Sequence, residues 1–353
     1  TYSVQLVIDD AGGGFSCDPI WVAAAASAGG LNETQWATDL GINNLGSAAL
    51  RYAFQILPRG ANNTGEELGV VFTLESNTSV VYTNIWSELT GDEGAGAINV
   101  CVDNLGQAGV TTRTFNTGNS GTFGQTIVGM RDGGSELIGS GERARIGFLF
   151  ENDEFRTNIG FMNAGTNTIS IDVEFFTNDG TSLGSDSINL APLSNRQWNQ
   201  AFRRATTDDV AAGYVDVWSD TSGASFLSYA SMVDNATGDP TTIWPFEPGE
   251  ASSGGDCRPI WIAAAASAGG LNDTQWATDL GINNLGPDPM NFRFQMLPRG
   301  QDNSDSEMSD TFTLGGDMGV AYTDVWSEMT GAEGAGSLNV CVDPGALAGV
   351  TSR

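Results

Sequence analysis

The feature of this sequence that most limits its fold is a long internal repeat. The segment Cys17-Asp-Pro-Ile-Trp21 returns as Cys257-Arg-Pro-Ile-Trp261, an offset of 240 residues (17 to 257). The offset then holds without a gap to the last residue, where Thr111-Thr-Arg113 matches Thr351-Ser-Arg353. Most aligned positions are identical, so the first and last parts of the chain are expected to share one fold.

A weaker repeat lies inside the 240-residue period. Residues 35–46 resemble residues 154–165, and an alternating stretch follows each of them. Two further pairs of segments also correspond, namely 80–86 with 195–202 and 98–103 with 215–220. The sequence therefore predicts three copies of one folding unit rather than two.

Each copy is predicted to be a β-sandwich. Residues 50–57, 169–176 and 226–233 are rich in β-branched and aromatic side chains, alternate in polarity and end in turn residues. The chain holds 47 glycines, which favours many turns over long helices. About seven strands per copy with regular turns is typical of an immunoglobulin-like sandwich. The expected fold is all-β, with three tandem immunoglobulin-like domains at 17–132, 133–256 and 257–353.

The third predicted domain stops before its repeat is complete. Arg353 matches Arg113, and in the first domain a further predicted strand follows at 122–128. The third domain should therefore lack its final strand, which would leave unpaired backbone groups and an uncovered core.

The first ten residues form an unusually regular amphipathic strand pattern. Their apolar side chains alternate on one face, at Tyr2, Val4, Leu6 and Ile8, and a glycine hinge completes the segment 1–16. We expect this strand to complete the third domain of a neighbouring subunit by β-strand addition, giving a head-to-tail homopolymer. Two alternatives stay open: the strand belongs to the first domain of its own chain, or the incomplete copy reflects a truncated chain.

This combination of a terminal strand and an incomplete sandwich resembles the donor-strand-exchange pilins and other secreted bacterial filament subunits. The resemblance is architectural and rests on no sequence motif. It implies a structural subunit of an extracellular filament or surface assembly. The alternative is a secreted glycan-binding adhesin, or a surface-layer module without strand exchange.

The cysteines obey the repeat. Cys17 and Cys101 are separated by the same interval as Cys257 and Cys341, which predicts one disulfide in each of the outer domains. In the middle domain the position of Cys101 corresponds to Trp218, so that domain is expected to depend on packing. Disulfides place the protein outside the cytoplasm, and the start at Thr1 fits a chain whose export signal has been removed.

Composition excludes several kinds of function. All 14 basic residues are arginine, there is no histidine, and the net charge is −29, so nucleic-acid binding is not expected. The missing cations also exclude triads that use histidine and mechanisms that use lysine. Acidic residues cluster at Glu151, Asp153 and Glu154, which would suit a glycosidase, but a charged turn is the favoured interpretation. We expect no enzyme, no cofactor and no membrane span.

Three weaker features remain. Asp302, Asp305, Glu307 and Asp310 form a weak candidate for calcium. The chain also contains nine tryptophans, of which six form three repeat pairs that fit core packing better than a carbohydrate platform. Glycosylation triplets occur at Asn32, Asn62, Asn77, Asn235 and Asn272.

Overall fold

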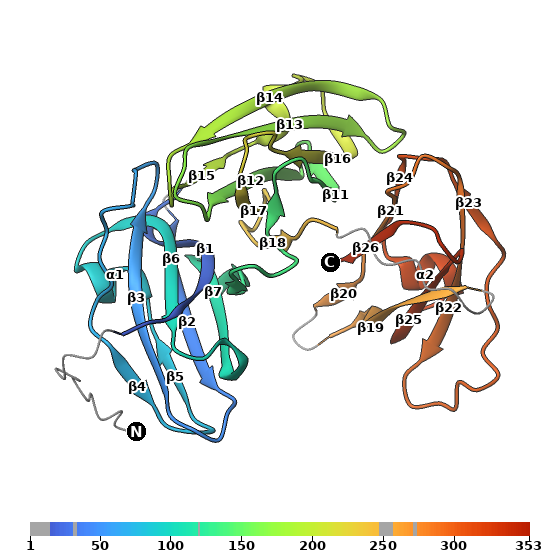
Figure 1. Ribbon diagram of the computed structural model, residues 1–353. Helices are drawn as coiled ribbons and strands as arrows, with labels where there is room; N and C mark the ends of the chain where they lie inside the picture. Colours follow the sequence, from blue (N-terminus) through green and yellow to red (C-terminus); the bar gives the residue numbers. More distant parts are fainter. Residues whose placement is uncertain (1–14, 31–33, 119–120, 247–256, 271–273) are drawn as a thin grey trace.

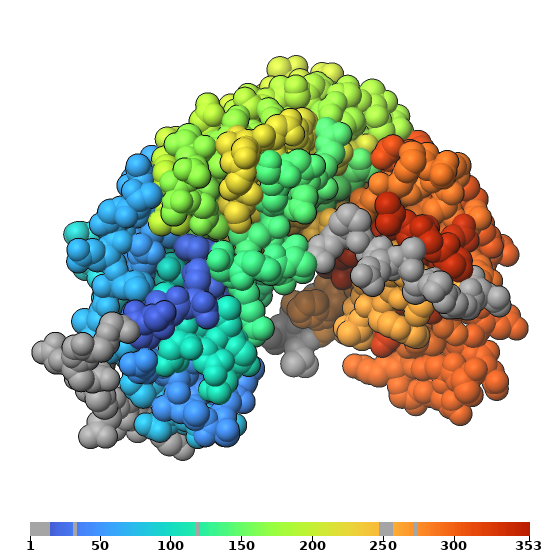
Figure 2. Space-filling view, viewed as in Figure 1, coloured from blue at the N-terminus to red at the C-terminus, as the bar shows by residue number. Residues whose placement is uncertain are grey.

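The computed structural model describes residues 15–30, 34–118, 121–246, 257–270 and 274–353 and consists almost entirely of antiparallel strands. The strands fall into three consecutive blocks along an arch, with block 2 between blocks 1 and 3 (Figure 1). The space-filling view shows the same succession, from blue through green to orange and red (Figure 2). The prediction of an all-β protein is confirmed.

Block 1 forms one sheet that folds over itself, because β1 pairs with β2 only near the turn between them. A short helix, α1, covers one end of the core. The elements of block 1 are β1 (Asp18–Gly29), β2 (Gln35–Asn44), β3 (Leu50–Pro58), β4 (Phe72–Leu74), β5 (Ser79–Tyr82), α1 (Ile85–Thr90), β6 (Gly94–Val102), η2 (Leu105–Gln107), β7 (Ala108–Gly118), β8 (Gly121–Gln125) and β9 (Met130–Arg131).

Block 2 consists of two separate sheets packed on one core, with strand orders β10-β17-β12-β15 and β11-β16-β13-β14. Its elements are β10 (Ile138–Gly139), β11 (Arg143–Glu151), β12 (Phe155–Asn163), β13 (Ile169–Thr177), β14 (Ser182–Leu190), β15 (Asn195–Trp198), η3 (Ala201–Arg204), β16 (Val210–Trp218), β17 (Ser225–Asp234) and β18 (Pro240–Ile243).

Block 3 repeats block 1 with the offset of 240 residues, down to the register of its strand pairs. Its elements are β19 (Arg258–Gly269), β20 (Gln275–Ala277), β21 (Leu280–Asn284), β22 (Met290–Pro298), β23 (Phe312–Leu314), β24 (Gly319–Tyr322), α2 (Val325–Thr330), β25 (Gly334–Val342) and β26 (Ala348–Ser352).

All three blocks share one strand order. The order β1-β6-β3-β4 of block 1 recurs as β11-β16-β13-β14 and as β19-β25-β22-β23. On the other side of each core, β5-β2-β7 recurs as β15-β12-β17 and as β24-β21-β26. The weaker sequence repeat thus corresponds to a real repeat of topology.

One buried asparagine explains why residues 35–46 resemble residues 154–165. Asn44, Asn163 and Asn284 end the equivalent strands β2, β12 and β21 and are at most 1% exposed. In each block the side-chain amide donates to three backbone carbonyls, and its oxygen accepts from the N–H two residues later. A buried amide that satisfies four groups fixes the turn after the strand.

The third block differs from our expectation at its core. Its described strands include no counterpart of β8 or β9, and β26 is much shorter than β7. The core is nevertheless closed, because Leu280, Phe294 and Val340 are at most 1% exposed. In block 1 the residues after β7 instead cover the outer face of β1, where Ile127 and Met130 pack with Trp21. The expected uncovered core is wrong; it is the outer face of β19 that the described residues leave uncovered.

Candidate functional site

The features most able to serve a function are the surfaces that join the blocks. Blocks 1 and 2 meet through an apolar cluster whose members are all at most 9% exposed. Block 1 and the segment after it contribute Trp21, Ala23, Ala24, Leu57, Ala97, Ile127 and Met130. Block 2 contributes Met162, Leu193, Leu227 and Tyr229.

Hydrogen bonds surround this cluster. Asn63 is 1% exposed, and its side-chain amide donates to the Leu193 carbonyl at 2.7 Å. The Asn63 backbone N–H donates to the Pro192 carbonyl at 3.1 Å. From the other side, the Asn195 amide donates to the Ala23 carbonyl at 3.1 Å. Apolar burial with paired polar groups is typical of a fixed interface between domains.

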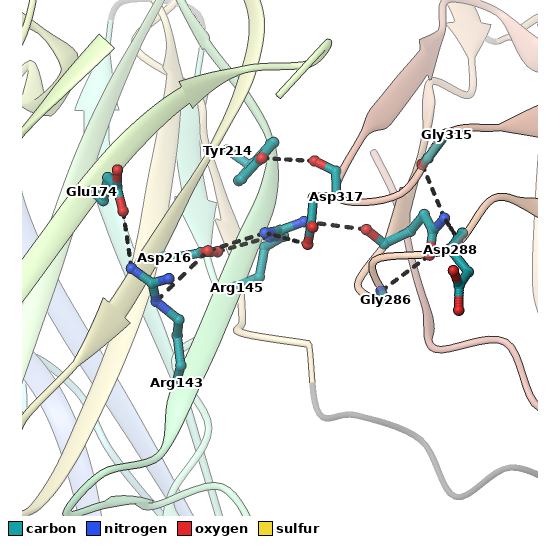
Figure 3. A network of polar contacts seen from close by, with 10 residues as sticks. Arg143, Arg145, Glu174, Tyr214, Asp216, Gly286, Asp288, Gly315 and Asp317 are labelled. Atoms are coloured by element: carbon teal, nitrogen blue, oxygen red, sulfur yellow. Dashed lines mark hydrogen bonds and ion pairs between the residues drawn. The ribbon is translucent and has the colours of Figure 1, made fainter. Parts of the chain in front are cut away.

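Blocks 2 and 3 meet through a polar network around Arg145 (Figure 3). The guanidinium of Arg145 forms a two-pronged ion pair with Asp216, with N–O distances of 2.7 and 3.0 Å. Its third nitrogen donates to the Asn284 carbonyl of block 3 at 3.2 Å. The Tyr214 hydroxyl donates to the Asp317 carbonyl at 2.7 Å. One arginine thus connects the sheet of block 2 to the strand end fixed by the buried asparagine of block 3.

The electrostatics of this join favour the charged arginine. Burial opposes the charge of Arg145, but the hydrogen bonds and negative charge of Asp216 outweigh that effect and raise the pKa of Arg145. Its guanidinium carbon also lies 3.9 Å from the centre of the Tyr214 ring. Burial raises the pKa of Tyr214 to about 12, so the hydroxyl remains a donor.

Sequence reasoning did not identify this join. The sequence does contain an indication of this contact. Arg143 and Arg145 are two of only 14 cations, and because they are two residues apart they lie on the same face of β11. Figure 3 shows both arginines directed to Asp216, with Glu174 holding Arg143. In a chain so poor in cations, two arginines on one strand face mark a place where a positive charge is needed.

The cysteines pair as predicted. The structure joins Cys17 to Cys101 and Cys257 to Cys341, with Cα–Cα distances of 5.4 and 5.5 Å. Each bond ties the start of one strand to its neighbour, since Pro19 is paired with Cys101 in β6.

The predicted donor strand, Tyr2, Val4, Leu6 and Ile8, lies outside the described residues. So do two of the glycosylation triplets, those of Asn32 and Asn272. Strand donation and modification at these two positions remain predictions.

The other glycosylation candidates differ in accessibility. Asn62 and Asn77 are exposed. Asn235 is also exposed, but its amide nitrogen donates to the carbonyls of Asn152 and Asp153 and its oxygen accepts from Arg156. A sugar attached to Asn235 would break these bonds, so Asn62 and Asn77 are the better acceptors.

The candidate metal ligands do not gather into a site. Asp302, Asp305, Glu307 and Asp310 are all exposed. Within the described ranges, no group of three or more acidic or cysteine side chains is arranged to hold a metal ion.

The acidic cluster before β12 separates into different environments. Glu151 is 1% exposed and accepts from the Thr157 backbone N–H at 3.2 Å, whereas Asp153 and Glu154 are exposed. Burial raises the pKa of Glu151 from 4.5 to about 7. The three residues thus form a turn with one buried carboxyl, rather than a pair of carboxylates facing one substrate.

The tryptophans only partly follow the prediction of core packing. Trp86 and Trp326 are buried residues of the helices α1 and α2, and Trp21 is 5% exposed. Trp261 and Trp276 are 59% and 65% exposed, so core packing is wrong for these two. For Trp261 the cause is the outer face described above: Ile127, Met130 and block 2 cover Trp21, and the described chain has no segment that covers Trp261.

A cleft of 330 Å³ opens between blocks 1 and 2. It is lined by polar uncharged and aromatic side chains such as Trp36, Asn116, Gln197 and Tyr229, and by Arg59 and Arg156. Among the residues that the structure describes, no carboxylate lines the cleft, and such a lining is suited to neutral or anionic polar molecules.

No described helix has the length and apolar character needed to cross a bilayer.

Comparisons with known proteins do not assign a family. No family model matches the sequence, and no match is found among curated proteins. Among solved structures the chain is similar to a Streptomyces avermitilis alpha-L-rhamnosidase complexed with L-rhamnose, with 9% sequence identity and a TM-score of 0.19. The similarity covers 96% of this chain and 44% of that one, so the chain spans less than half of its length. A TM-score this low supports no conclusion about fold or activity.

Proposed function

We propose that the protein is a structural subunit of an extracellular filament or surface assembly, built from three tandem immunoglobulin-like sandwich domains. The common strand order of the blocks and their two-sheet cores support such domains. The disulfides support an oxidising compartment outside the cytoplasm. The proposed role is mechanical, and no catalysis is assigned.

The observation that carries the proposal is a strand edge that is paired in block 1 and has no such partner among the described residues in block 3. The Ala37, Trp36 and Gln35 edge of β2 pairs with residues 115–117 of β7. The equivalent strand β20 pairs, among the described residues, only with β19. An open edge accepts a strand from another chain through main-chain hydrogen bonds.

The proposed donor is the amphipathic strand at the start of a neighbouring subunit. Its apolar residues would enter at the edge of β20, and the contact would be head to tail. Such a contact generates a polymer unless its rotation closes a ring. Burying one aliphatic side chain contributes about 1.5 to 3 kcal/mol, so four of them would hold two subunits firmly.

Two substitutions in the strand test this route. Leu6→Asp places a charge on the apolar face, whereas Gln5→Asp places the same charge on the polar face. We expect the concentration at which the chain assembles to rise at least about tenfold for Leu6→Asp and to change little for Gln5→Asp. Sedimentation velocity of both variants and the unmodified chain measures this. Equal behaviour of all three chains would refute strand donation.

A second candidate, glycan binding, is favoured by the cleft between blocks 1 and 2. Its amide, tryptophan and arginine lining would suit a neutral or acidic oligosaccharide. Titration calorimetry with oligosaccharides, comparing the unmodified chain with Gln197→Ala, tests this candidate. Binding that Gln197→Ala weakens would support it, and no heat with any sugar would remove it.

A further inference from the structure

The most informative surface outside the proposed strand edge is the outer face of β19 in block 3. Trp261 is 59% exposed there, whereas the same residue in block 1, Trp21, is 5% exposed. Ala263 and Ala264 are also exposed, while their counterparts Ala23 and Ala24 are 1% and 8% exposed. An apolar face with Trp at its centre is an unusual surface for an isolated soluble domain.

The structure shows what such a face binds, because block 1 carries its own copy. There the face is covered by the segment ending in β9 and by block 2. The covering side chains of block 2 come from β12, β17 and the turn before β15: Met162, Leu227, Tyr229 and Leu193. The partner that fits the chemistry of this face is therefore a β unit with the surface of block 2.

Polar groups around the face are retained in block 3. In block 1, the N–H groups of Gly60 and Asn63 donate to carbonyls of block 2 at 3.0 and 3.1 Å. Their counterparts are Gly300 and Asn303, and in the described part of the chain neither N–H has an acceptor. The Asn303 side chain keeps the internal bond to the Pro298 carbonyl but lacks the partner that Leu193 provides in block 1.

One residue of this face differs in type between block 1 and block 3. Ala97 of block 1 is Ser337 in block 3, where its hydroxyl donates to the Ala263 carbonyl at 3.0 Å. That carbonyl is the counterpart of the Ala23 carbonyl, which accepts from Asn195 in block 1. Because a carbonyl oxygen has two lone pairs, the serine leaves room for a second donor.

The opposite face of block 1 gives independent support for alternating units. Leu45 and Val81 are 69% and 68% exposed, whereas their counterparts Leu285 and Ala321 are partly buried, and Ala321 packs against the core of block 2. Blocks of the first type thus contact block 2 through two different faces, and in each of them the described residues cover one face and leave the other exposed.

We infer that the outer face of β19 is a docking surface for a second β unit of the block 2 type. A second copy of this chain does not supply it, because the matching surface of block 2 is already covered by its own block 1. The inference does not rest on strand donation, since it concerns the face of β19. An added unit that continues from Arg353 would also pair with β20, as residues 115–117 pair with β2 in block 1.

The test extends the full chain with a second copy of residues 114–246 after Arg353, which continues the repeat. Hydroxyl-radical footprinting then compares the oxidation rates of Trp261 and Trp21 by mass spectrometry. If the copy docks, exposure of Trp261 falls from 59% toward the 5% of Trp21, and its oxidation rate falls about tenfold. The copy of Trp198 in the added unit reports whether that unit is folded, because Trp198 is buried in block 2. If that copy is protected and the oxidation rate of Trp261 is unchanged, the inference is overturned.

Two controls make the outcome specific. Leu227→Glu in the added copy should restore oxidation of Trp261, whereas Ser185→Glu, at an exposed site, should not. For the unextended chain, protection of Trp261 that increases with protein concentration would identify a second copy as the occupant and overturn the inference. Failure of strand donation leaves all these outcomes unchanged.

Discussion

At the scale of single residues, a buried asparagine sets the geometry of each block. Asn163 donates to the carbonyls of Asn167, Leu190 and Ala191 and accepts from the Gly165 N–H. No other residue type of that size both donates twice and accepts, which explains its recurrence in three blocks.

We predict that Asn163→Ala destabilises block 2 by about 2 to 4 kcal/mol, because it removes several hydrogen bonds and leaves buried carbonyls unpaired. Urea denaturation with hydrogen exchange of block 2 peptides measures the loss. Asn189→Ala makes the same change at an exposed position of β14 and should cost little. Equal effects of the two substitutions would contradict the role of Asn163.

Glu151 gives a prediction about pH. Its pKa is raised by burial to about 7 in the folded chain, so between about pH 4.5 and 7 the native state holds a proton that the unfolded state has lost. Stability from this group is therefore present at low pH and is lost as pH rises through 7, by about 3 kcal/mol in total. Glu151→Gln should remove this loss and raise the stability at pH 8.

Denaturation curves of the unmodified chain and Glu151→Gln at several pH values from 4 to 8 check this. Glu154→Gln, at an exposed position of the same turn, is the control. A Glu151→Gln chain that keeps the full pH dependence would contradict the assignment.

At the scale of elements, a disulfide joins two neighbouring strands in blocks 1 and 3, whereas a cation–π contact joins the equivalent strands in block 2. In block 1, Pro19 and Cys101 are paired across neighbouring strands. The equivalent pair of block 2 is Arg143 with Trp218, and the Arg143 guanidinium lies 4.0 Å from the centre of the indole. The Trp that replaces the cysteine thus binds the neighbouring strand by a cation–π contact.

Reduction should therefore act on the blocks unequally. We expect a reducing agent to destabilise blocks 1 and 3 by about 4 kcal/mol each, the contribution of a disulfide that closes a loop of this length. Block 2 should keep its stability. Hydrogen exchange with and without reductant, followed block by block, measures the difference, and equal loss of protection in all three blocks would contradict it.

Much of the fold could be predicted from periodicity alone. The strands at 50–57 and 169–176 follow from patterns within one block, and the disulfides follow from the equal cysteine spacing of two blocks. The exposure of Trp261 and the burial of Glu151 could not be predicted in this way. Trp21 and Trp261 have nearly identical local sequences, and what distinguishes them is the cover that Trp21 receives from the segment ending in β9 and from block 2. Contacts between blocks are absent from local patterns, so faces that depend on them were misjudged.

At the scale of the whole molecule, the path of the arch depends on how the blocks are joined. Arg145 is 9% exposed and belongs to both an ion pair within block 2 and the contact with block 3. Removing Arg145 should lower the stability of block 2 and loosen the contact between blocks 2 and 3, and a second substitution can separate these two effects.

Arg145→Met should cost about 3 to 5 kcal/mol, because it leaves the buried Asp216 without its main partner. Adding Asp216→Leu should recover much of this stability, since an apolar pair replaces a buried ion pair at little cost. Neither the single nor the double variant has a side chain that donates to the Asn284 carbonyl. Small-angle X-ray scattering should therefore show a wider range of angles between blocks 2 and 3 in both variants. A double variant that keeps the scattering profile of the unmodified chain would show that Arg145 does not set this angle.

The proposed function requires that this chain build an ordered extracellular assembly, and electron microscopy of the purified, oxidised chain over a range of concentrations tests it. We expect filaments or sheets whose repeat corresponds to the three-block arch, and far fewer of them from Leu6→Asp chains. Single arches of 36.9 kDa at every concentration, with no ordered association, would contradict it.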